Sequence, residues 1–213
     1  MGLTGFFLIT FITIHLLVNS FSLISPELFN QGSHFMATNP LIQVMQYALA
    51  AGFLIHIIMG LILTAQNKAA RGKSYAKNNA SANSGIASRS MIYTGLLVLV
   101  FIVLHMKDFF MEVKFGSLGH VDVTSHGITT IMQNDYSLMH AVFSLPLYTA
   151  IYVIAFIALG IHLNHGFQSA FQSMGINHSR YNKLIKNAGT AFSVLIAVGF
   201  STIAITHFVA SLN

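Results

Sequence analysis

The sequence contains no cysteine, and only 7% of its 213 residues are charged. Without cysteine there are no disulfides, thiolate zinc sites, cysteine-ligated iron–sulfur clusters or covalent CxxCH haem attachments. A soluble domain usually carries about a quarter charged residues, so this scarcity excludes an ordinary water-soluble domain and also a disordered chain. The chain has instead 54% hydrophobic residues and 11 histidines, against ten Lys plus Arg and five Asp plus Glu. A metal centre would therefore use histidine, methionine or oxygen ligands.

Five apolar stretches approach or reach the roughly 20 residues that a membrane-spanning helix needs. They cover about 2–18, 41–65, 90–106, 139–167 and 188–212. We therefore predict an all-α integral membrane protein in which residues 1–213 form one domain with five transmembrane helices. The first stretch has no basic flank and no cleavage pattern, so it does not resemble a signal peptide, and we expect further residues upstream of Met1.

Lysine and arginine predict the orientation of these helices, because cytoplasmic loops accumulate them. The loop 66–89 and the loop after the fourth stretch hold eight of the ten basic residues. The loop 19–40 has none, and the loop 107–138 has two against four acidic residues. The N-terminus is therefore predicted to be cytoplasmic and the C-terminus outside. We detect no internal repeat, no glycine-rich phosphate loop and no strand-like alternation in the chain.

Each of the first four stretches contains a histidine inside the predicted membrane, where ionisable residues usually mark function. Counting 1.5 Å per residue places His15 and His105 in the outer half and His56 and His162 in the inner half. Neutral imidazole is a good iron ligand, and helix bundles build cofactor sites from facing side chains. Two pairs at matched depths indicate a four-helix bundle that holds two stacked haems. The alternative for any single histidine is a hydrogen bond to a neighbouring helix.

Small residues support the inner pair, because positions four residues away share the face of the ligand and leave room for a macrocycle. These residues are Gly52, Gly60, Ala158 and Gly166. They bracket His56 and His162, whereas His165 has no such neighbours. We therefore predict His162 as the ligand and assign His165 to a haem propionate or a quinone, or to the role of alternative ligand. The outer pair rests on depth alone.

Three motifs carry a resemblance to a known family. They are Thr4-Gly5-Phe6-Phe7-Leu8 with His15, the segment QNKAARG at 66–72, and the segment IHLNHGFQSAF at 161–171, which continues to GINH at 175–178. With them the sequence resembles, over nearly its whole length, the dihaem cytochrome b membrane-anchor subunit of succinate dehydrogenases and fumarate reductases. The likeness is to the single-chain type with five helices.

The resemblance implies two b haems, one ligand coming from each of the first four helices. His15 and His105 would then hold a distal haem, and His56 and His162 a proximal haem. It also implies an FAD-containing flavoprotein subunit and an iron–sulfur subunit docked on the cytoplasmic face, against the basic loops 68–89 and 180–186. The expected location is a bacterial inner (cytoplasmic) membrane, and the expected substrate is a quinone, with menaquinone as the plausible one.

One position departs from the family pattern. Some members carry an acidic residue two positions before the ligand on the fourth helix, where this chain has Gly160, and the five predicted spans contain no acidic residue. This counts against a transmembrane proton path of that type.

The function expected from these features is electron transfer between the iron–sulfur subunit and membrane quinone. Weak candidates for acid–base partners of the quinone are Glu27, His34, His120 and His126. Two alternatives stay open: a haem-bearing quinone subunit of another oxidoreductase, such as a hydrogenase or formate dehydrogenase, and a membrane transporter with a histidine-lined path. The transporter has less support, because the spans carry no carboxylates to share a cation.

Overall fold

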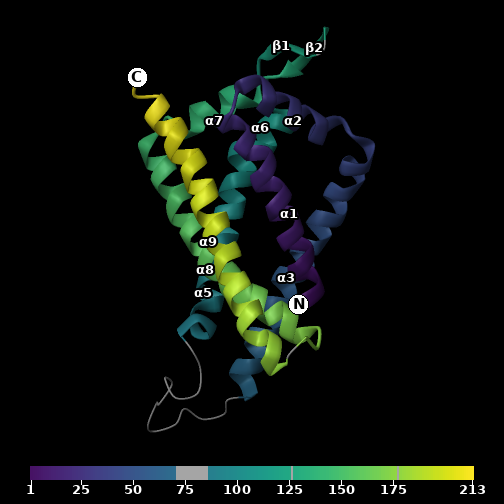
Figure 1. The fold of residues 1–213 in the computed structure, drawn as a ribbon, viewed down its shortest axis with the longest axis vertical. Helices are drawn as coiled ribbons and strands as arrows, with labels where there is room; N and C mark the ends of the chain where they lie inside the picture. The colour runs from purple at the N-terminus through teal and green to yellow at the C-terminus, as the bar shows by residue number, and fades with distance from the viewer. Residues whose placement is uncertain (71–85, 126, 177) are drawn as a thin grey trace.

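The computed structural model describes residues 1–70, 86–125, 127–176 and 178–213, and it is mostly helical. The long helices are α1 (Gly2–Ser20), α3 (Pro40–Ala70), α5 (Ile86–His105), α8 (Pro146–Ser173) and α9 (Ser179–Ala210). They run along the long axis of the molecule and successive ones alternate in direction, so the N-terminus and the α8–α9 turn share one end (Figure 1). Within the described ranges, α1 with its short extension to Leu23, α3, α8 and α9 are long and apolar enough to cross a membrane.

These helices confirm that the chain is mainly α-helical and that it carries helices suited to a membrane. The predicted stretches 2–18 and 41–65 fall within α1 and α3, and the stretch 188–212 covers α9 from residue 188 and continues two residues past its end at Ala210. The stretch 90–106 corresponds to α5, whose membrane crossing stays a prediction. Residues 71–85 of the basic loop lie outside the described residues.

The stretch predicted at 139–167 is divided between two helices, which corrects its start. α7 covers Asp135–Phe143, and α8 begins at Pro146 and continues to Ser173. Proline has no amide hydrogen to continue a helix, but it fits the first helical position. The Thr149 hydroxyl donates to the Phe143 carbonyl oxygen at 2.8 Å and so satisfies a group freed by the break.

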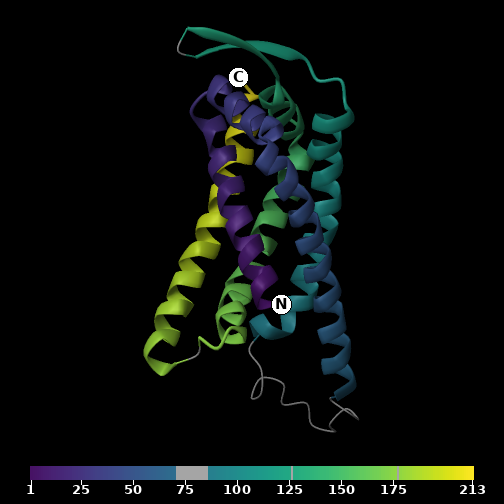
Figure 2. The same cartoon turned by 90° about the vertical axis from the view of Figure 1, so that its right-hand side faces the viewer.

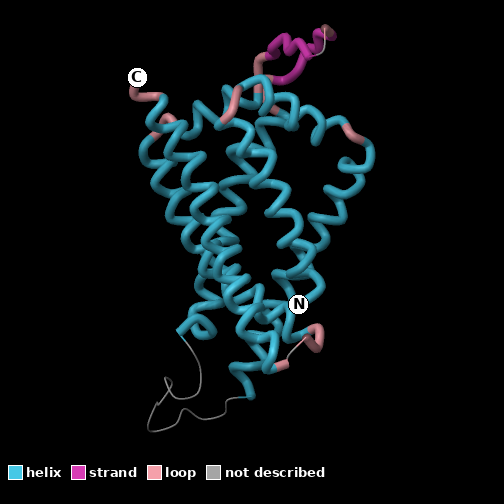
Figure 3. Tube along the Cα trace, in the orientation of Figure 1, coloured by secondary structure: helices cyan, strands magenta, loops and turns pink. Residues whose placement is uncertain are grey.

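The short elements gather at the end opposite the N-terminus, which we call the hairpin end (Figures 1 and 3). They include α2 (Pro26–Thr38), α6 (Glu112–Phe115), α7 and the strands β1 (His120–Ser125) and β2 (Ile128–Gln133). The strands are antiparallel, with His120 opposite Gln133 and Val123 opposite Thr130. The expectation of no strand was therefore wrong. The hairpin lies across this end in Figure 2 and keeps only 1% of Val123 exposed.

The tightest packing lies between α8 and α9. Ile196 and Ala204 of α9 and Ala158 of α8 are buried. A Cβ atom added to Gly160 would lie 2.9 Å from the Cβ of Ala197, so the two helices approach as closely as small residues allow. By contrast, α3 packs chiefly against α1 and α2, and many of its side chains remain exposed.

Candidate haem-binding site

Two pairs of histidine rings face each other between the long helices. His56 of α3 and His162 of α8 have ring centroids 6.4 Å apart, at 73°. His15 of α1 and His105 of α5 have ring centroids 5.8 Å apart, at 84°. With metal–nitrogen bonds of about 2 Å, two imidazoles on opposite sides of one metal ion place their ring centroids about 6 Å apart. Both separations match that value.

The two pairs lie at different depths of the bundle. Thr4 is in contact with His56, and His15 lies eleven positions further along α1. At 1.5 Å per residue, this spacing corresponds to about 16 Å along the helix axis. We keep the names outer pair for His15 with His105, which is nearer the hairpin end, and inner pair for His56 with His162.

Threonine hydroxyl groups hold both rings of the inner pair. Thr4 Oγ1 lies 3.3 Å from His56 Nδ1, and Thr94 Oγ1 lies 3.4 Å from His162 Nδ1. Each hydroxyl has a backbone carbonyl in the preceding turn to which it donates its own hydrogen. Its oxygen is therefore available to accept a hydrogen from Nδ1, which leaves Nε2 unprotonated. Such a partner on the second nitrogen fixes the tautomer of a metal-ligating histidine.

Aromatic rings surround the outer pair instead. The His15 ring lies 5.3 Å from Phe11 and 5.6 Å from Phe200, and Asn19 Nδ2 lies 3.4 Å from its Nδ1. Besides His15, the rings close to that of His105 belong to Phe109 at 5.2 Å, Phe101 at 5.7 Å and Tyr152 at 6.2 Å. The Nδ1 atom of His105 is buried and has no hydrogen-bond partner in the described structure. The outer pair is thus packed mainly among aromatic rings.

The three glycines expected beside the inner pair differ in how much free space surrounds them. A Cβ atom on Gly60 or Gly166 would meet only a methionine methyl group, at 3.7 Å in each case. The space at Gly52 is filled by a phenylalanine ring of α1, 3.0 Å from such an atom. Gly95 of α5, which sequence reasoning missed, lies against the His162 ring, because an added Cβ would be 3.3 Å from its Cε1.

None of the remaining predicted residues that the structure describes takes part in the ring contact of either pair, although His165 is close enough to His162 for an electrostatic interaction. His165 is half-buried, three positions beyond His162 on α8, and does not join the ring contact of the inner pair. Glu27 is exposed at the start of α2, His34 is half-buried on α2 and His120 is exposed on β1. His126 lies outside the described residues. Glu27, His34 and His120 share the hairpin end, but no hydrogen bond joins them there in the described ranges.

A polar cluster that sequence reasoning missed joins α2 to α7. The Asn30 side chain donates to Asn134 Oδ1 at 3.3 Å and accepts from the Tyr136 amide at 2.9 Å. The Ser33 hydroxyl donates to Asp135, whose carboxyl group is close enough to His34 for an electrostatic interaction. Burial raises the pKa of Asp135, and the Ser33 hydrogen bond and His34 only partly oppose this. The asparagine–aspartate helix start is the signal that was available in the sequence.

Asp135 is expected to make the protein less stable as pH rises. Its folded-state pKa lies above the ordinary value of 3.8, so the folded state binds the proton of this carboxyl group more tightly than the unfolded state does. The stability that this difference contributes is present at low pH and is lost as pH rises through the raised pKa. Asp135→Asn should remove that slope and raise the unfolding temperature at neutral pH. Thermal unfolding from acidic to neutral pH measures this, with Asp122→Asn on the exposed face of β1 as the matched control. An unchanged slope in Asp135→Asn would contradict it.

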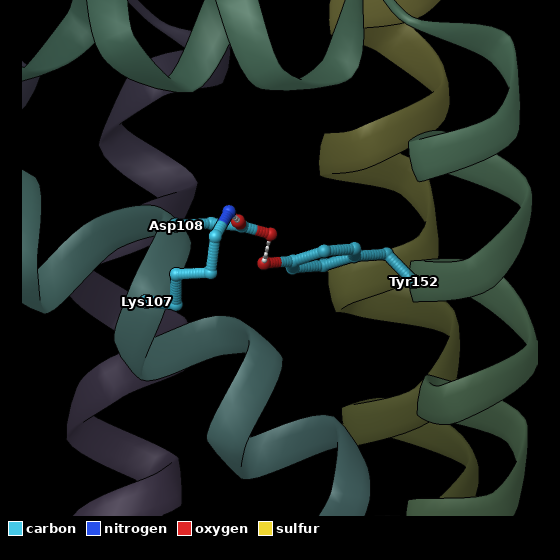
Figure 4. A network of polar contacts seen from close by, with 3 residues as sticks. All are labelled: Lys107, Asp108 and Tyr152. Atoms are coloured by element: carbon cyan, nitrogen blue, oxygen red, sulfur yellow. Dashed lines mark hydrogen bonds and ion pairs between the residues drawn. The ribbon is translucent and has the colours of Figure 1, made fainter.

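A second polar cluster is formed by Lys107, Asp108 and Tyr152 (Figure 4), and the Tyr152 ring lies 6.2 Å from that of His105 in the outer pair. The Tyr152 hydroxyl donates to Asp108 Oδ2 at 3.0 Å, and Lys107 Nζ lies 3.2 Å from Asp108 Oδ1. Asp108 is 6% exposed, whereas most of the Lys107 side chain is in contact with solvent. Asp108 belongs to η2, a π-helical segment (Met106–Met111) that follows His105 directly. The sequence predicted only a loop here.

Comparison with protein-family models, with curated proteins and with solved structures gives no match for this chain. Its site is therefore interpreted from its own geometry.

Proposed function

We propose that this chain is the dihaem cytochrome b membrane anchor of a succinate:quinone oxidoreductase, that is, a succinate dehydrogenase or fumarate reductase. The outer pair would hold a distal haem b and the inner pair a proximal haem b. The observation that carries this proposal is that four helices supply one histidine each, in two ring pairs at the separation expected across one metal ion.

The residues around each pair have separate tasks in this proposal. When bound, the two haems supply one-electron transfer between an iron–sulfur subunit and membrane quinone. Thr4 and Thr94 orient the inner rings and keep Nε2 free for a metal. The aromatic rings around the outer pair exclude water. Because each proposed haem would be held by two histidines, neither site would offer a free position for oxygen chemistry.

The ends of the molecule support the proposed orientation in a bacterial inner membrane. Lys68 in the last turn of α3 and Lys183 and Lys186 near the start of α9 lie at the end that also holds the N-terminus (Figure 1). A cytoplasmic position for this end agrees with the positive-inside rule. We propose that the iron–sulfur subunit and its FAD-containing flavoprotein partner dock here, and that the quinone, with menaquinone as the plausible one, reacts towards the hairpin end, where His34 and Glu27 lie.

The test is a haem count on the purified protein together with a dithionite-reduced minus oxidised spectrum. We expect two haem b groups per chain and co-purification of a flavoprotein and an iron–sulfur protein. Two haems with a different catalytic partner would assign the chain to another quinone-linked oxidoreductase. Protein that contains no haem would contradict the proposal and favour the transporter alternative.

The threonine contacts give a more specific prediction. Thr94→Val removes the hydroxyl beside His162 Nδ1 and keeps the shape of the side chain, so it should weaken haem retention at the inner site. Loss of such a partner typically costs about 10- to 100-fold in metal affinity. Haem release under increasing detergent or imidazole measures the effect. Thr64→Val is the matched control, because Thr64 is exposed on the same side of the molecule and donates only to its own helix. Equal release in both variants would refute the role of Thr94.

A further inference from the structure

The Tyr152 hydroxyl and the Asp108 carboxylate form a buried pair (Figure 4), and the Tyr152 ring lies beside that of His105 in the outer histidine pair. The Tyr152 side chain is 1% exposed, its hydroxyl donates to Asp108, and its ring lies 6.2 Å from that of His105. Burying a carboxylate in an apolar segment is costly. A group of this kind therefore marks function more often than packing.

His105 is held differently from the histidines of the inner pair. Its Nδ1 atom has no hydrogen-bond partner in the described ranges, whereas both inner rings have a threonine hydroxyl at this position. A metal-ligating histidine is usually oriented through its second nitrogen. The orientation of the His105 ring depends instead on the rings packed around it, those of Phe101, Phe109 and Tyr152.

Of these three rings, that of Tyr152 has a polar anchor. Its acceptor, Asp108, lies in the π-helical segment η2, which begins at the residue after His105. Short π-helical segments occur frequently at functional sites. The hydrogen bond therefore ties α8, which carries Tyr152, to the backbone that carries His105.

We propose that Tyr152 is a positioning residue for the outer pair, and that its hydrogen bond to Asp108 fixes the plane of the His105 imidazole relative to that of His15. This inference rests on the proposed function, because its effect is observed on the haem that the pair holds. The two imidazole planes are 84° apart. Since this angle is close to its maximum of a right angle, releasing His105 can only make the planes more parallel on average.

The experiment uses the purified full chain, or its complex, and records the electron paramagnetic resonance spectrum of the oxidised haems. The largest g value of a low-spin ferric haem with two imidazoles falls as the ligand planes become more parallel. Tyr152→Phe keeps the ring and removes the hydrogen bond, so we expect a lower g value for the outer haem and no shift for the inner haem. Tyr136→Phe is the matched control, because Tyr136 is also at the hairpin end but contacts neither histidine of the outer pair.

Substitutions of Asp108 separate its effect on the position of Tyr152 from the effect of its own charge. Asp108→Asn still offers an oxygen to Tyr152, so the g value should stay unchanged, whereas loss of a buried negative charge favours the reduced haem. We expect an approximately tenfold shift in the reduction equilibrium of the outer haem, or about 59 mV for one electron. If Tyr152→Phe does not fold, Asp108→Leu removes the acceptor instead and should lower the same g value.

The outcomes distinguish this inference from the proposed function. Wild-type protein without haem contradicts the proposed function, and the positioning role falls with it. Wild-type protein with two haems and an unmoved outer signal in Tyr152→Phe contradicts the positioning role alone. Equal changes in both haem signals would also overturn it, because general loosening of the bundle has no preference for the outer pair.

Discussion

Purified His162→Ala protein is expected to contain one haem b per chain instead of two, and His56→Ala should give the same result. In the proposed function these two rings ligate one iron, and their ring centroids are 6.4 Å apart. Removing either ring would leave a single histidine to hold the proposed haem and a cavity where the other ring packed. The outer pair lies about 16 Å away along α1, so the distal haem should be retained. Haem content and the redox difference spectrum measure both effects.

His165→Ala is the control for these variants. His165 lies on the same helix, three positions from His162, but does not join the inner ring contact. We expect it to keep both haems, with at most a shift in the spectrum of the proximal one. Loss of a haem in His165→Ala and its retention in His162→Ala would move the ligand to His165. Both haems retained with unchanged spectra in His56→Ala would reject the inner site.

Gly160→Glu is expected to prevent stable packing of α8 against α9. Even a Cβ atom at this position would lie 2.9 Å from the Cβ of Ala197 and 3.3 Å from the carbonyl oxygen of Ser193. Overpacking alone costs about 1–3 kcal/mol and sometimes more. A carboxylate forced into the same space also needs hydrogen-bond partners or a counter-charge. We expect a large fall in the unfolding temperature, or aggregation during purification.

Two further glycine variants test whether the effect depends on the size of the new side chain and on its position. Gly160→Ala should be destabilised less than Gly160→Glu, because only one atom must be accommodated. Gly119→Glu introduces the same side chain in the connection before β1, where an added Cβ would meet nothing within 4 Å, and should unfold like the wild type. Stable, well-packed Gly160→Glu protein would contradict this prediction, because it would show that α9 can move away and accommodate an acidic residue at this position.

The long helices were predictable because each apolar run is longer than the usual distance between residues that favour turns. The pairing of rings was also predictable: depth counting placed His15 with His105 and His56 with His162, and the structure brings these rings together. Counting works here because a helix has a fixed rise per residue and successive long helices alternate in direction. The role of these histidines as iron ligands stays a prediction.

The short elements were not predicted, and apolar composition hid the break between α7 and α8. The run through 139–167 stays hydrophobic across the break, and only Pro146 reports the start of a new helix. The hairpin contains only two six-residue strands, too short for a clear alternation. Asp108 was counted only as one of the acidic residues of the predicted loop 107–138, since nothing local shows that a π-helical turn directs it towards Tyr152. Its partner is 44 positions away in the chain.

The separation of the two histidine pairs has an electrical consequence. A distance of about 16 Å along α1 is roughly half of the 30 Å hydrocarbon core. Moving one elementary charge across the whole membrane is worth about 2.3 kcal/mol per 100 mV, so in the proposed function an electron passing between the pairs would exchange roughly 1.2 kcal/mol per 100 mV with the membrane potential. Because Gly160 leaves no room for a compensating carboxylate, the transmembrane voltage would act directly on the rate and direction of electron transfer through this subunit.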